Sequence, residues 1–198
     1  MRFFIFFAGL PFLFTACEEP IYTPKPRGFP KVIYPEKAYQ SFSKDYCNFT
    51  FDYPEYANIE QDKSFFGEET PNACWFDLHI PNFDSRIYFS YIPIDKENTF
   101  EKLKGDAFKM TDWHNKKATY IDESLIQKNN GVNGMLFRVE GPAASPLQFF
   151  LTDSLAETHF LRGALYFNTQ ARPDSLAPVL DFVKKDIEKM LDTFEWTD

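Results

Sequence analysis

Apolar and polar residues alternate along several segments of this 198-residue chain, and such alternation predicts β-strands with one buried face. In one of these segments, Ile87, Phe89 and Tyr91 alternate with more polar neighbours. We expect strands near residues 31–34, 47–53, 73–80, 86–92, 118–127, 132–140, 147–153 and 159–168. Because Asn129-Asn130-Gly131 suits a tight hairpin turn, the pattern indicates mainly antiparallel pairing.

Two further segments carry apolar residues at helical spacing. The first helix should begin near Asn98, which forms a capping-box pattern with Glu101, and should end near His114. Asp174 is expected to cap the second helix, which closes the chain. Its apolar stripe comprises Leu176, Val179, Val183, Ile187, Met190 and Phe194.

This order of elements predicts a single α+β domain over residues 31–198, with a mainly antiparallel sheet and both principal helices packed on one face. Aromatic residues make up 19% of the chain, and their bulk favours pleated surfaces. The order of elements also resembles PsbP/Mog1-like domains. That likeness concerns topology and implies no function.

The N-terminal segment has the features of a lipoprotein signal. Its apolar run, residues 3–16, falls short of the roughly 18 residues that span a bilayer. Small residues directly precede Cys17, as lipidation of a cysteine requires, so we expect residues 1–16 to be removed and Cys17 to anchor the protein to a membrane. The alternative is a plain signal peptide whose last residue happens to be cysteine.

Residues 17–30 are rich in proline and should form an extended tether between lipid and domain. Lys25 and Arg27 make this tether basic within a chain of net charge −8, so it could dock on a protein partner. It could equally be a solvated spacer. The overall acidity argues against a nucleic-acid partner.

Cys47 and Cys74 remain once Cys17 is lipidated. An even number of cysteines in an exported protein is the pattern expected of one disulfide. Each cysteine begins an alternating segment, so neighbouring strands could bring the two together. Two buried free thiols are the alternative.

Catalytic motifs are scarce. The chain has neither a nucleophile elbow nor a phosphate-binding glycine loop, and its three histidines lie far apart, so we expect neither a cofactor nor a metal site. The densest polar group is Asp153, His159 and Arg162. In an enzyme, His159 would act as a base oriented by Asp153, and Arg162 would hold an anionic substrate. The alternative, which we favour, is a hairpin turn with Arg162 on one sheet face.

Six separated segments, in the same order, resemble the gliding-motility lipoprotein GldD family of Bacteroidota. They are residues 23–29 (TPKPRGF), 51–57 (FDYPEYA), 74–75 (CW), 148–154 (QFFLTDS), 159–168 (HFLRGALYFN) and 174–179 (DSLAPV). The resemblance implies a cell-envelope lipoprotein that supports gliding motility and type IX secretion, with envelope proteins as partners and no established reaction. Two hypotheses therefore remain: a non-enzymatic assembly factor, or an envelope enzyme using the Asp153/His159/Arg162 group.

Overall fold

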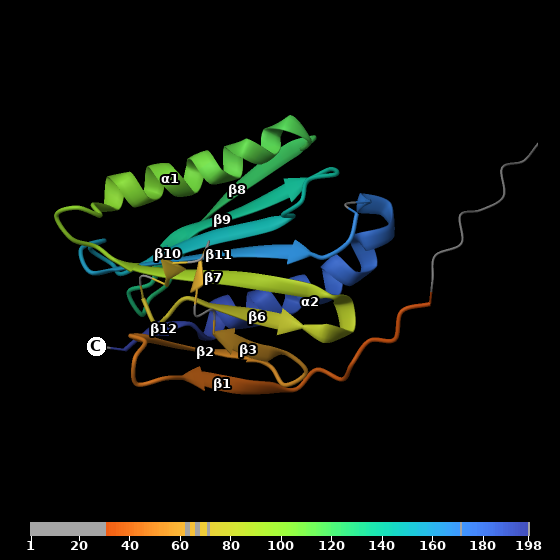
Figure 1. Ribbon diagram of the computed structural model, residues 1–198, viewed down its shortest axis with the longest axis horizontal. Coiled ribbons are helices and arrows are strands. Elements are labelled where there is room, and N and C mark those ends of the chain that lie inside the picture. The colour runs from red at the N-terminus through yellow and green to blue at the C-terminus, as the bar shows by residue number, and fades with distance from the viewer. Residues whose placement is uncertain (1–30, 62–63, 66–67, 71, 171, 198) are drawn as a thin grey trace, which may run out of the picture. The chain divides into compact units, whose positions relative to one another are not determined.

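A seven-stranded antiparallel sheet runs through the computed structural model, in the order β3–β6–β7–β11–β10–β9–β8 (Figure 1). The structure describes residues 31–61, 64–65, 68–70, 72–170 and 172–197. The strands of this sheet are β3 (Asn58–Gln61), β6 (Phe76–Ile80), β7 (Ser85–Pro93), β8 (Tyr120–Gln127), β9 (Asn133–Glu140), β10 (Leu147–Thr152) and β11 (His159–Phe167). The predicted α+β class and antiparallel pairing are confirmed.

A smaller sheet has the order β1–β2–β12 and is formed by β1 (Tyr39–Ser43), β2 (Phe49–Pro54) and β12 (Glu195–Trp196). Two short strands, β4 (Ser64–Phe65) and β5 (Glu68–Glu69), form a separate pair. The strand predicted over residues 31–34 is wrong, because this segment has no strand partner and Ile33 is 79% exposed.

In the described part of the chain, two α-helices complete the fold, α1 (Phe100–Asp112) and α2 (Pro173–Thr193), with short 3-10 turns at Pro81–Phe83 and Trp113–Lys116. Both predicted caps are wrong by one or two residues. Thr99, not Asn98, caps α1, and its side chain accepts a hydrogen bond from the backbone of Lys102. Arg172 occupies the cap position of α2 without a side-chain cap, and Asp174 lies in the first turn, where its charge complements the helix dipole.

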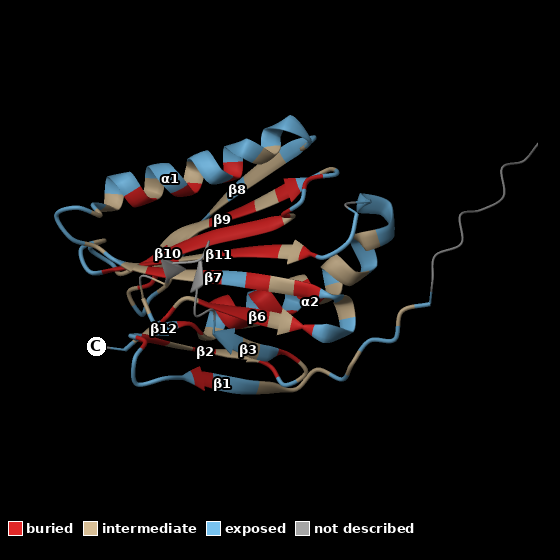
Figure 2. Cartoon of the chain, viewed as in Figure 1, coloured by how far each residue is buried: buried red, intermediate tan, exposed pale blue. Residues whose placement is uncertain are grey.

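The two helices lie on opposite faces of the large sheet, which corrects the prediction of one shared face. Leu161 of β11 belongs to the core that contains Val183 of α2, whereas its neighbour Phe160 packs with Leu103 of α1. Strands β10 and β11 are accordingly buried along most of their length (Figure 2). Strands that are apolar on both sides require a cover on each side of the sheet.

A disulfide joins Cys47 to Cys74, with a Cα–Cα distance of 5.6 Å. The two cysteines lie two residues before β2 and β6, which belong to different sheets, so the bridge links the small sheet to the large one rather than two neighbouring strands. Phenylalanine rings also pack between the two sheets: Phe42 of β1 stacks on Phe76 of β6, with ring centroids 4.8 Å apart. The same phenylalanine cluster belongs to the core that α2 completes.

Before β1, the chain runs beside α2. The ring of Tyr34 lies 4.8 Å from that of Phe182, and Lys37 donates a hydrogen bond to the Phe182 carbonyl at 3.0 Å. Lys37 also pairs at 2.5 Å with the carboxylate of Asp186, which is 3% exposed and accepts further hydrogen bonds from the hydroxyls of Tyr39 and Tyr56. We call Lys37, Tyr39, Tyr56 and Asp186 the Asp186 cluster.

Candidate functional site

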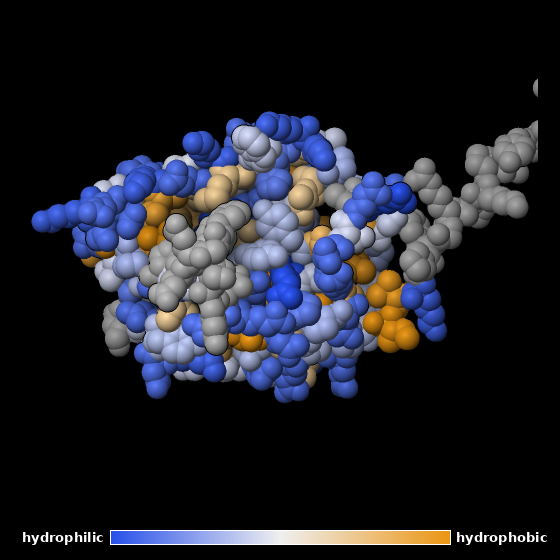
Figure 3. Space-filling model, viewed as in Figure 1, coloured by the Kyte–Doolittle hydropathy of each residue, from blue (hydrophilic) through white to orange (hydrophobic). Residues whose placement is uncertain are grey.

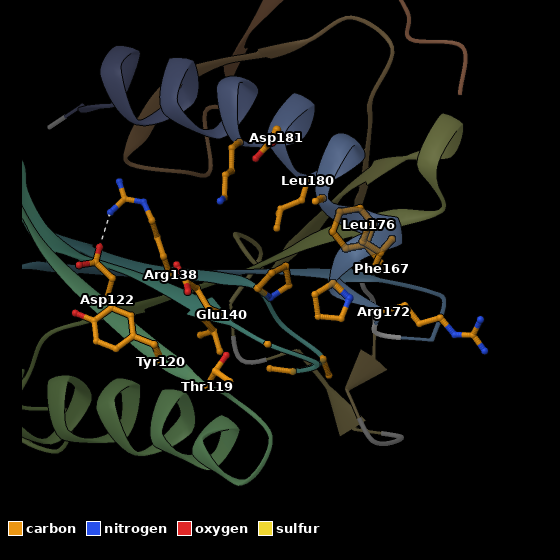
Figure 4. Close-up of a pocket in the computed structure, with 18 of the residues that line it drawn as sticks. Thr119, Tyr120, Asp122, Arg138, Glu140, Phe167, Arg172, Leu176, Leu180 and Asp181 are labelled. Atoms are coloured by element: carbon orange, nitrogen blue, oxygen red, sulfur yellow. Dashed lines mark hydrogen bonds and ion pairs between the residues drawn. The ribbon is translucent and has the colours of Figure 1, made fainter. Parts of the chain in front are cut away.

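A cleft of about 590 Å³ separates the N-terminal half of α2 from the outer strands β8 and β9 (Figure 4). Side chains of α2 line one wall of the cleft, and side chains of β8 and β9 line the other. The loop after β9 and the end of β11 close it. Figure 4 shows the strands between α2 and the other helix, so the cleft lies on the α2 side of the sheet.

The apolar lining of the cleft comes from α2 and from the segment between β9 and β10. Leu176 and Leu180 are one helical turn apart and point to the same side of α2. Phe167 and Pro146 extend this surface. Gly141 is required in the turn, because its φ is +100° and a Cβ there would come within 2.8 Å of the Thr119 hydroxyl.

Charged side chains surround this apolar surface. Arg138 of β9 faces Asp122 of β8 across the strand pair and donates to its carboxylate at 2.9 Å (Figure 4). The same guanidinium donates to the Ser124 hydroxyl at 2.8 Å. Asp181 and Lys184 of α2 add charges of both signs on the other wall. The cleft is therefore amphipathic, which suits docking of a partner segment with an apolar side and polar edges.

The described lining residues of the cleft include neither histidine nor cysteine. Sequence reasoning missed the site as a whole. The helical stripe included Leu176, but the pattern did not show that this residue would line a cleft at the edge of the core. The charges of Asp122 and Arg138 on the inner side of their strands were the available signal, because a fully covered sheet face is apolar.

Asp153 serves the turn between β10 and β11. Its carboxylate accepts hydrogen bonds from the backbone N–H groups of Glu157, Thr158 and His159 at 3.2, 3.0 and 2.9 Å. Burial alone would raise the pKa of Asp153, but these backbone hydrogen bonds outweigh it and hold the pKa below its usual value. The carboxylate contacts the backbone of His159, whereas an orienting partner of a catalytic base would bind the imidazole.

His159 and Arg162 lie on opposite faces of β11. The His159 ring is 2% exposed, shares a 2.7 Å hydrogen bond with the Tyr91 hydroxyl, and stacks on Trp196 with centroids 4.8 Å apart. Arg162 reaches the α1 side instead, where it donates to Gln148. The structure therefore does not bring the Asp153/His159/Arg162 group together, because residues three apart on a strand point in opposite directions.

The other predicted site residues are placed as follows. Cys17, Lys25 and Arg27 lie outside the described residues. No group of three or more His, Cys, Asp or Glu side chains in the described ranges could hold a metal ion. Within those ranges, no helix has both the length and the apolar character needed to cross a bilayer.

The sequence matches a known family over nearly its whole length. The family model described as Gliding motility lipoprotein GldD covers residues 19–196. The chain belongs to this family. Membership confirms the resemblance noted in the six segments and gives this GldD-family protein a role in gliding motility. It also identifies the chain as a lipoprotein, anchored to a membrane of the cell envelope.

The fold has a counterpart among solved structures. The solution structure of cyanobacterial PsbP (CyanoP) from Synechocystis sp. PCC 6803 aligns with a TM-score of 0.51 and 11% sequence identity. The alignment covers 82% of this chain and 94% of that one. This likeness confirms the PsbP-like fold and concerns the fold alone. Among curated proteins, no significant match was found.

Proposed function

We propose that this GldD-family lipoprotein is a membrane-tethered docking domain. It supports gliding and the linked type IX secretion machinery by contacting other envelope proteins, and it catalyses no reaction. The observation that carries the proposal is the amphipathic cleft between α2 and strands β8–β9, which is open and lined by apolar residues with charges of both signs around them. The separation of His159 from Arg162 supports a non-enzymatic role.

The chemistry of the cleft defines its partner. Leu176, Leu180 and Phe167 offer an apolar surface that a partner's aliphatic or aromatic side chain would cover. Arg138 on the β9 wall, and Asp181 and Lys184 on the α2 wall, would orient a segment that carries complementary charges. We therefore expect the partner to be a protein segment of the gliding and secretion apparatus with apolar anchors and charged flanks.

Filling the cleft tests this proposal. Ala177 lines the cleft and is exposed, so Ala177→Trp places an indole in the space without disturbing the core. Ser175→Trp, an exposed position of the same helix outside the described lining, is the matched control. We expect Ala177→Trp to weaken crosslinking to envelope partners at least about tenfold, a loss of about 1.4 kcal/mol, and to reduce gliding and secretion. The control should behave as wild type.

Both variants must accumulate in the membrane at normal levels for this comparison. If Ala177→Trp then glides, secretes and crosslinks as the Ser175→Trp control does, the cleft is not the docking site. If both variants lose function equally, the effect comes from the first turns of α2 in general, and the cleft proposal also fails.

The membrane anchor of the proposal rests on Cys17. Cys17→Ala should abolish incorporation of a fatty-acid analogue and release the protein from washed membranes, because acylation is the anchor that the sequence offers. A variant that still carries the label would contradict lipidation at this residue.

Changing Lys25 and Arg27 together to Glu should weaken partner capture while leaving the unfolding midpoint unchanged, because we place the tether outside the core.

A further inference from the structure

A second hollow lies on the other side of the large sheet from the cleft. Its volume is about 570 Å³, and it lies between the C-terminal half of α1 with the following turn and the exposed side of β11. Its described lining includes Lys109, Trp113, His114, Arg162 and Tyr166. On the face seen in Figure 3, α1 forms the upper edge and paler, less polar atoms lie beneath it.

Arg162 forms part of the wall of this hollow and lacks a counterion. Its guanidinium donates to Oε1 of Gln148, a neutral amide, and within the described ranges it makes no ion pair with a carboxylate. Burial lowers the pKa of Arg162 from its ordinary value, as expected of a cation removed from water. The guanidinium keeps further N–H donors that Gln148 does not use, and a carboxylate would take two of them in parallel.

The neighbouring charges add to this preference for an anion. Lys109 and His114 line the same hollow, against one carboxylate, that of Asp106. The pKa of His114 is lowered by burial and by the positive charge of Arg162, so the two groups are close enough to interact. The lowered pKa disfavours the charge of His114, but Arg162 and Lys109 outnumber Asp106, so the described lining is net positive in a chain whose net charge is −8. Charge complementarity therefore favours a negatively charged ligand.

Apolar side chains form the rest of the wall. Trp113 is 68% exposed, with the Lys116 ammonium over one face of its ring at 3.4 Å from the centroid, and Met110 is 43% exposed. Side chains of this size are more often buried in a core. Tyr166 lies beside them and contacts Tyr88 edge to face, with centroids 5.6 Å apart. The electron-rich face of an aromatic ring attracts the weakly positive C–H groups on the face of a sugar ring.

We propose that this hollow binds an acidic sugar: the carboxylate of a hexuronate unit pairs with Arg162, and its ring lies against Trp113 and Tyr166. An extended peptide could not bind here as an added strand. Strand β11 is paired on both sides, with β7 and β10, so its backbone offers no free edge to which an extended peptide could add. A sugar needs no such edge, because its ring stacks and its hydroxyls bind side chains.

Titration of the full-length protein, purified in detergent, with oligoglucuronate tests this inference. The chain has three tryptophans, so the indole N–H signals in an NMR spectrum separate Trp113 from the half-buried Trp75 and Trp196. We expect saturable binding that shifts the Trp113 signal, and at least about tenfold weaker binding in Arg162→Met. Arg138→Met, which removes an arginine from the α2 cleft, is the matched control and should bind as wild type.

Glucose oligomers and N-acetylglycine separate the contributions of ring and carboxylate. The proposal is overturned if the oligoglucuronate fails to shift Trp113, if neutral glucose oligomers bind equally well, or if N-acetylglycine binds as tightly as oligoglucuronate. Should Arg162→Met fail to fold, Trp113→Ala decides, because its exposed side chain contributes little to folding. It should weaken oligoglucuronate binding several-fold as measured by calorimetry, since the variant lacks the Trp113 signal, and unchanged binding would refute the stacking contact.

Discussion

Removing the carboxylate of Asp186 should destabilise the domain strongly, because the Asp186 cluster is a buried ionic group with several dependent partners. The Asp186 carboxylate is 3% exposed and accepts hydrogen bonds from Lys37, Tyr39 and Tyr56. In Asp186→Ala these three donors lose their acceptor together. The variant also leaves the ammonium group of Lys37 without its counterion.

The magnitude follows from the burial of each partner. Breaking a buried ion pair by removing one partner costs about 3–5 kcal/mol. The Lys37 side chain is 27% exposed and can regain some water, which places the cost at the lower end. The tyrosine hydroxyls are partly buried and lose bonds to a charged acceptor, worth about 1.5–3 kcal/mol each before solvent replaces them. We expect Asp186→Ala to lower the free energy of unfolding by about 3 kcal/mol.

Urea unfolding followed by circular dichroism measures this loss, with the disulfide intact throughout. Asp181→Ala, an exposed aspartate of the same helix, is the control and should change stability by no more than about 0.5 kcal/mol. A second readout is the pKa of Tyr39, which is raised to about 12 by burial, by its hydrogen bond to Asp186 and by the charge of that residue. In Asp186→Asn this pKa should fall but stay above its usual value, since burial remains.

A loss below about 1 kcal/mol, or a loss equal to that of the Asp181→Ala control, would refute the reasoning, because it would mean that water replaces the cluster at little cost. An unchanged pKa of Tyr39 in Asp186→Asn would refute the electrostatic part separately.

Two further predictions concern stability. The disulfide between Cys47 and Cys74 closes a loop with a sequence separation of 27, so replacing both with alanine should cost about 3 kcal/mol, and an unchanged urea midpoint would contradict this. Asp153→Ala should cost about 1–3 kcal/mol, because three backbone donors lose their acceptor, and Asp153→Asn should cost less. The pKa of Asp153 is lower in the folded state than in the unfolded state. The ionised carboxylate therefore stabilises the fold fully above its unfolded pKa, and this stabilisation is lost as the pH falls through its folded pKa. Unfolding of wild type and Asp153→Asn across this pH range checks that wild type loses its advantage at low pH.

Six strands of the large sheet, including the edge strand β8, could be predicted, because they carry a clear apolar pattern and reach several residues in length. The short edge strands β1, β3 and β12 could not, and β3 has only Ile59 as an apolar residue. Only Phe42 is buried in β1, and β12 has just two residues, so neither leaves a pattern above chance. Residues 31–34 have strand-forming composition, but Tyr34 packs through its ring against α2 and makes no strand pair.

The positions of the helices and of the candidate sites were harder to predict for a physical reason. Alternation tells which residues share a face but not which helix covers that face. The evidence was nevertheless present in β10 and β11, whose nearly continuous apolar runs indicate cover on both sides. The same strand geometry separates His159 from Arg162, so the catalytic hypothesis could have been rejected from spacing alone.

The Asp186 cluster also determines how the domain carries a mechanical load. Strand β1 lies at the edge of its sheet and pairs with β2 from Tyr39 onward, so a pull on the preceding residue would peel these hydrogen bonds apart one pair at a time. Lys37 lies just ahead of that point and is bound to the Phe182 carbonyl and to Asp186 in α2. A pull applied through the residues before Lys37 would thus pass into a helix that packs in the main core, and the edge strand β1 would be shielded from it.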